Sequence, residues 1–117
     1  ATGEQGCRET IARWVSPEMP FYQTLLRDCG FAADVDRIEA ALADGGWEAA
    51  GRAVSDELLD DVALVGDPAT WRDKLARLHD VGVSLVCPYF RAYGPDGEDT
   101  VLADIRAAAD ALTPRPG

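Results

Sequence analysis

The sequence predicts an α/β fold, because two short apolar runs typical of buried strands alternate with two amphipathic helices in the second half of the chain. The first run is Val62–Val65, four consecutive apolar residues that Gly66 closes. The second is Val83–Cys87, which Pro88 closes. Runs of this length are too short for a helix and suit strands buried on both faces.

The first 61 residues predict helices only. Ile11, Trp14 and Val15 follow the spacing of one helix face, and a break follows at Ser16-Pro17. Similar patterns continue to Ser55, with Gly30 as a left-handed cap and Asp34 and Ser55 as N-caps. The expected helices are residues 7–15, 21–29, 34–44 and 47–54 and a brief one after Ser55, with a break at Gly45-Gly46.

The segment between the two apolar runs predicts a helix. Asp67 suits its N-cap and Pro68 its first residue, and Gly82 ends it. A final helix is expected over residues 100–112. The order strand, helix, strand predicts a βαβ unit with parallel strands and a right-handed crossover.

Two parallel strands alone make an incomplete sheet. Parallel sheets occur almost only where helices cover both of their faces. The pattern therefore matches the last two βα units, with preceding helices, of a TIM (β/α)8 barrel, which needs about 250 residues. The 117 residues are accordingly predicted to be a single segment, the C-terminal part of a barrel. Residues 1–61 would be mainly helical and residues 62–112 would form a β-α-β-α sequence.

Composition excludes several classes of function. Twenty-one acidic and eleven basic residues give a net charge of −10, and no basic patch is evident, so nucleic acid is not an expected partner. No apolar run approaches the roughly 18 residues that span a membrane. The three cysteines lack metal-like spacing and predict reduced, buried thiols in a cytoplasmic protein. With His79 as the single histidine, no metal site is expected.

Barrel active sites lie at the C-terminal ends of the strands, so the loops after Val65 and Cys87 are the candidate binding regions. In the second loop Arg91 stands beside Tyr89 and Phe90, where a guanidinium among aromatic rings can grip an anion and stack on a flat ring. The alternative is an ordinary surface loop with Arg91 paired to nearby acids. In the first loop, Gly66 opens a helix N-terminus that could hold a phosphate, although capping by Asp67 is the favoured interpretation.

The stretch VSDELLDDVALVGDPATWRDKLARLHDVGVSLVCPYF resembles the C-terminal region of luciferase-like flavin- or deazaflavin-dependent oxidoreductases. The upstream IARWVSPEMPFYQTLLRDCGF resembles the helical stretch that precedes it in that family. The resemblance implies hydride transfer or monooxygenation of a small-molecule substrate, with FMN or deazaflavin (F-420) in the intact enzyme. This piece would close the barrel and place Arg91, Tyr89, Phe90 and Gly66 at the pocket. Catalytic residues are not identified, and the earlier strands, which carry most isoalloxazine contacts in the family, are absent.

A second hypothesis is a stand-alone, non-catalytic α/β module for binding or assembly. Its short sheet would have an exposed edge, which self-association could complete. A third is that a separate polypeptide supplies the missing strands. The expected macromolecular partner is therefore a second copy or the rest of the barrel.

Overall fold

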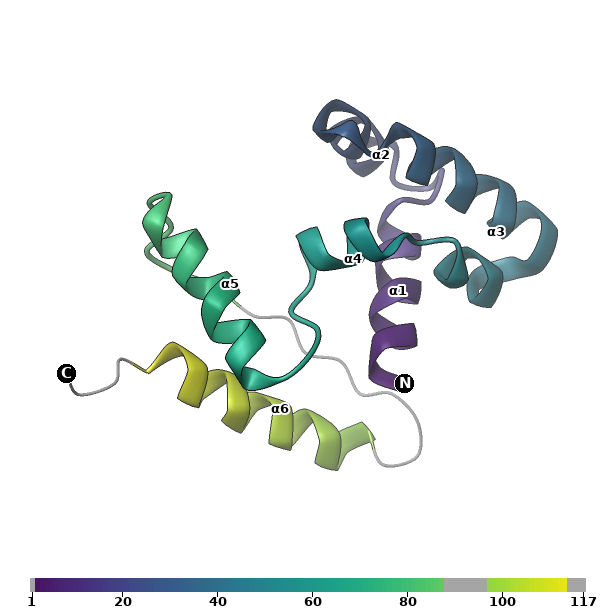
Figure 1. Cartoon of the computed structure of the whole chain (residues 1–117). Helices are drawn as coiled ribbons and strands as arrows, with labels where there is room; N and C mark the ends of the chain where they lie inside the picture. Colours follow the sequence, from purple (N-terminus) through teal and green to yellow (C-terminus); the bar gives the residue numbers. More distant parts are fainter. Residues whose placement is uncertain (1, 88–96, 114–117) are drawn as a thin grey trace. The chain divides into compact units, whose positions relative to one another are not determined.

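The computed structural model describes residues 2–87 and 97–113, and this part of the chain is helical, with turns and segments without regular secondary structure between the helices (Figure 1). It divides into two compact units, Ala1–Ala63 and Leu64–Gly117. The first holds α1 (Thr2–Trp14), α2 (Pro20–Leu26), the π-helical turn η1 (Arg27–Phe31), α3 (Ala32–Arg52) and α4 (Asp56–Val62). The second holds α5 (Pro68–Asp80) and α6 (Gly97–Leu112).

The predicted α/β barrel portion is wrong, because the described residues contain no strand. Val62 is the last residue of α4, and residues 63–65 have no regular secondary structure. Residues 83–87, the second expected strand, likewise have no regular secondary structure, and Leu85 is 85% exposed. A strand needs a neighbouring strand for its backbone groups, so an apolar run alone does not make one.

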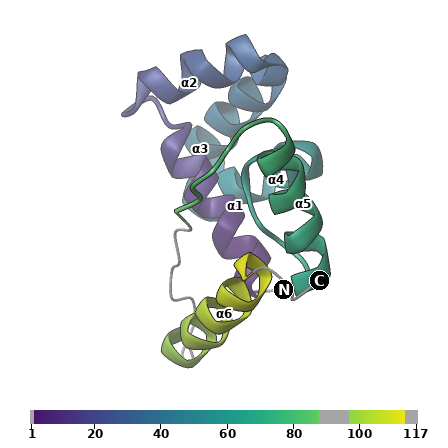
Figure 2. The same ribbon diagram turned by 90° about the vertical axis from the view of Figure 1, so that its left-hand side faces the viewer.

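The core of the first unit lies where α1 packs against α3, with α4 also against α1 (Figure 2). The close approach uses Gly51, a buried glycine of α3. A Cβ atom there would lie 2.7 Å from Glu9 Cγ and 3.2 Å from the Glu9 backbone nitrogen. The buried apolar side chains of this unit are Ala12, Val15, Phe31, Val35, Ile38, Ala50, Val54, Leu58 and Leu59.

Two glycines redirect the helices of this unit where the sequence predicts helix ends. Gly30 has φ 95° inside η1, and Gly46 has φ 69° and ψ −163°, which kinks α3. Glycine reaches positive φ without a steric cost. The angles at these residues confirm the predicted left-handed conformation of Gly30 and the predicted break at Gly45-Gly46. The predicted N-cap Asp34 is wrong, since α3 begins at Ala32 and Asp34 lies buried in its first turn.

In the described part of the second unit, α5 and α6 pack against each other. The predicted start of α5 is confirmed, with Asp67 as N-cap and Pro68 in the first turn, and Gly82 follows its end at φ 98°. No residue of α5 is buried, and in α6 the buried residues are Gly97 and Ala108. None of the helices in the described ranges has the length and apolar character to cross a bilayer.

Candidate functional site

The predicted binding residues fall into two groups. Gly66 is described and stands at the turn before α5, exposed, with φ 108°. Tyr89, Phe90 and Arg91 lie outside the described residues. Their role in binding is therefore still a prediction from the sequence.

The N-terminus of α5 is occupied by its own cap. Asp67 Oδ1 accepts hydrogen bonds from the Thr70 backbone nitrogen at 2.8 Å and from Thr70 Oγ1 at 3.1 Å. These bonds lower the pKa of Asp67, the backbone bond most, so the carboxylate is ionised at neutral pH. Pro68 lacks an N–H. A phosphate at this turn would meet a carboxylate, and the capping interpretation is confirmed.

The cap predicts a pH dependence for α5. Because the pKa of Asp67 is lowered from its ordinary 3.8, its stabilisation of the helix is complete above that value and is lost as the pH falls through the lower, folded-state pKa. Hydrogen exchange of the Thr70 amide should accelerate, relative to its intrinsic rate, over that acid range. Asp67→Asn keeps a cap acceptor without a titrating charge and should lack this step. The same step in both proteins would contradict the assignment.

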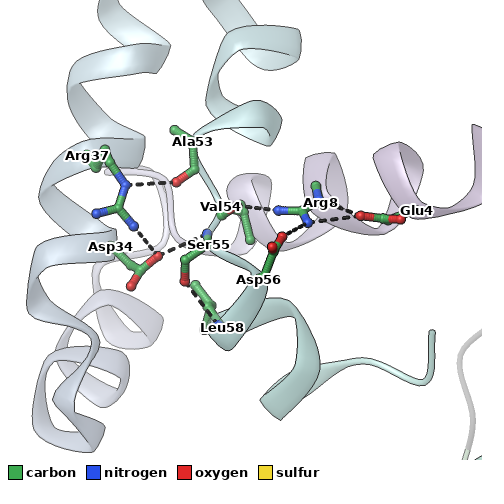
Figure 3. A network of polar contacts seen from close by, with 9 residues as sticks. All are labelled: Glu4, Arg8, Asp34, Arg37, Ala53, Val54, Ser55, Asp56 and Leu58. Atoms are coloured by element: carbon green, nitrogen blue, oxygen red, sulfur yellow. Dashed lines mark hydrogen bonds and ion pairs between the residues drawn. The ribbon is translucent and has the colours of Figure 1, made fainter. Parts of the chain in front are cut away.

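Polar groups that the sequence did not single out as a cluster gather around Arg8 in the first unit (Figure 3). Its guanidinium donates to Glu4 Oε1 at 2.9 Å, to Asp56 Oδ1 and to the carbonyl of Val54. The Arg8 side chain is 13% exposed. Hydrogen bonds to Asp56 and then Glu4 raise its pKa, so Arg8 is a permanent cation that joins α1 to the start of α4.

A second set of bonds surrounds the buried carboxylate of Asp34 (Figure 3). Asp34 Oδ1 accepts from the Ser55 backbone nitrogen at 3.1 Å and from Arg37 Nη2 at 2.6 Å. Arg37 Nε donates to the Ala53 carbonyl at 3.1 Å. Ser55 Oγ in turn accepts from the Leu58 nitrogen at 3.1 Å, which confirms the predicted cap.

The polar groups of this network are directed at other protein groups, so the arrangement fixes the turn between α3 and α4 and offers no activated nucleophile or base. A sequence signal existed for the Asp34-x-x-Arg37 pair, which has helical i,i+3 spacing. Nothing in the sequence pairs Asp34 with Ser55, because they are 21 positions apart.

Other candidate chemistry gives no site in the described ranges. No three His, Cys, Asp or Glu side chains there gather to hold a metal ion. The expectation of buried thiols is wrong for Cys29 and Cys87, which are exposed. His79 is in the last turn of α5.

The luciferase-like monooxygenase family model matches residues 2–85, more than two thirds of the chain, and spans sequence in both units. The chain therefore belongs to this family, and the resemblance seen in the sequence is confirmed. Gly66 lies inside the matched range, whereas Tyr89, Phe90 and Arg91 lie beyond it. Comparisons with curated proteins and with solved structures found no match.

Proposed function

We propose that the chain serves an oxidoreductase that uses FMN or deazaflavin to transfer hydride to, or to oxygenate, a small-molecule substrate. The observation that carries this proposal is the luciferase-like monooxygenase match over residues 2–85. In enzymes of this kind the cofactor supplies the redox chemistry, while the protein supplies binding, orientation and electrostatics.

The described residues limit where the cofactor's anionic groups could be held. The α5 N-terminus does not fit a phosphate, because the ionised Asp67 already accepts from Thr70 there. In this proposal Gly66 therefore acts through its positive φ, which sets the turn, and makes no contact with a phosphate. The binding role goes to Arg91, with Tyr89 and Phe90 as stacking surfaces. No step of the reaction is assigned to a residue.

Titration of the full chain with FMN and with deazaflavin, followed by tryptophan fluorescence, tests the proposal. At least one cofactor should quench the fluorescence saturably. Arg91→Ala should weaken that cofactor about 10- to 150-fold, the effect of losing a charge-assisted hydrogen bond of about 1.5–3 kcal/mol. Arg106→Ala, which removes an exposed arginine of α6, is the matched control and should leave the affinity unchanged.

Two results would count against parts of this proposal separately. No saturable quenching by either cofactor would remove cofactor binding from this chain. Binding that is equally tight in Arg91→Ala would keep the cofactor and remove Arg91 from its site.

A non-catalytic assembly module is the second candidate function, and one observation favours it. Large apolar side chains are exposed in the described part of the second unit, and such surfaces mark protein interaction sites. Native mass by light scattering, beside denatured intact mass, separates a self-associating chain from one that requires a second polypeptide. Self-association without binding of either cofactor would favour the module.

A further inference from the structure

Helix α3 carries an Asp-Gly pair at its kink. Asp44 and Gly45 stand directly before Gly46, whose φ of 69° and ψ of −163° interrupt the helix. All three residues are exposed, and a Cβ at Gly46 would meet nothing within 4 Å. The pair therefore lies in the last turn before the interruption, where helical segments fray. Local opening at such an end costs much less than unfolding of the core.

An aspartate followed by glycine can isomerise through a cyclic imide. The backbone nitrogen of Gly45 attacks Cγ of Asp44 in its carboxylic acid form. The Cγ–N bond forms, the Cγ–OH bond breaks, and the hydroxyl leaves with the amide hydrogen as water. Water then opens the ring at either carbonyl. Opening at Cγ restores aspartate, whereas opening at the backbone carbonyl leaves isoaspartate, in which the main chain runs through Cβ and Cγ.

The end of α5 offers a matched site with a different residue after the aspartate. Asp80 is the last residue of α5, and its side chain is 80% exposed. Gly82 follows two positions later with φ 98°, the same spacing as in α3. The residue between them is Val81, whose branched side chain shields its backbone nitrogen, whereas Gly45 has no Cβ beside its nitrogen. Asp96 also precedes a glycine but lies outside the described residues.

The stretch of α3 that follows the kink, residues 47–52, lies against α1. The guanidinium carbon of Arg13 is 4.5 Å from the centre of the Trp47 ring, and Gly51 is buried beside Glu9. Isoaspartate at residue 44 would add one atom to the main chain just before this stretch.

We propose that Asp44 is a modification site, at which the folded chain converts aspartate to isoaspartate and so displaces residues 47–52 from α1. The exposed helix end supplies the local freedom that ring closure needs, and Gly45 supplies the unhindered nitrogen. The inference does not depend on the proposed cofactor.

Ageing of the full chain at neutral pH and physiological temperature, followed by peptide mapping, tests the proposal. Trypsin releases residues 38–52 and 78–91, which contain Asp44 and Asp80 as their single aspartates. Electron-transfer fragmentation distinguishes isoaspartate from aspartate, which have equal mass. Isoaspartate should accumulate in residues 38–52 while residues 78–91 stay unmodified. Asp44→Glu keeps the charge and should abolish the product, because glutamate would have to close a larger ring.

A synthetic peptide of residues 38–52, aged beside the protein, shows how the pair converts without a fold. A protein in which residue 44 stays unmodified while the peptide converts would overturn the proposal, because α3 would then protect the pair. Equal conversion at residues 44 and 80 would also overturn it, since the glycine would not decide the site.

The effect on residues 47–52 is measured separately. The isomerised fraction, isolated by ion-exchange chromatography, should unfold at a lower urea concentration than the unmodified fraction from the same sample. Equal midpoints would overturn the displacement of this stretch from α1.

Discussion

Replacing Ile38 by alanine is expected to lower the free energy of unfolding of the first unit by about 2–5 kcal/mol. Ile38 of α3 is fully buried and is among the largest fully buried side chains of the described residues. The substitution removes buried apolar surface and leaves a cavity that the packed helices fill only in part. Chemical denaturation followed by far-UV circular dichroism measures the loss.

A graded series separates this core effect from a general effect of truncation. Ile38→Val removes a single methyl group and should cost about 0.5–1.5 kcal/mol. Leu25→Ala, in a helix of which no residue is buried, should cost less than Ile38→Ala. Equal losses at positions 38 and 25 would show that α3 does not form the core.

Replacing Gly51 by valine is expected to destabilise the first unit by about 1–3 kcal/mol or more, through overpacking. The new Cβ would lie 3.2 Å from the backbone nitrogen of Glu9, which cannot move without shifting α1. Contact with Glu9 Cγ at 2.7 Å adds to the crowding, although that side chain has more freedom to move. Thermal unfolding of the variant beside the wild type checks the sign and size.

Gly3→Ala is the matched control for this prediction. Gly3 is also a helical glycine, but a Cβ there meets nothing within 4 Å. Alanine favours the helix over glycine by up to about 1 kcal/mol, so this variant should be as stable as the wild type or more stable. If Gly51→Val proved equally harmless, α1 and α3 would not meet at this residue.

Features set by local chemistry were the ones the sequence predicted well. Positive φ at Gly30 and Gly46 follows from the freedom of glycine, and the caps at Ser55 and Asp67 follow from their short polar side chains. Each of these depends on residues within about four positions. Family membership was also predictable, because it depends on the order and spacing of short motifs along the chain.

Features that depend on distant partners were predicted poorly. The apolar runs at residues 62–65 and 83–87 were expected to pair as strands, but pairing depends on backbone neighbours that a run does not specify. Asp34 is of a residue type that often caps helices, but it lies within α3 and accepts a hydrogen bond from the Ser55 backbone nitrogen. At the candidate site the sequence pointed to Gly66 and Arg91. The structure describes Gly66 with the Asp67 cap beside it, whereas Arg91 lies outside the described residues.

The bonds of α1 to residues 54–56, the arm between α3 and α4, have a consequence for synthesis of the chain. Arg8 bonds to Val54 and Asp56, which are 46 and 48 positions later. At about 5–20 residues per second, the ribosome needs roughly 2–8 s to add the approximately 40 residues that separate Trp14 from this arm. Throughout that interval the Arg8 guanidinium lacks two of its acceptors, the Val54 carbonyl and the Asp56 carboxylate. α1 therefore cannot be bonded to the start of α4 until nearly all of the first unit has been made.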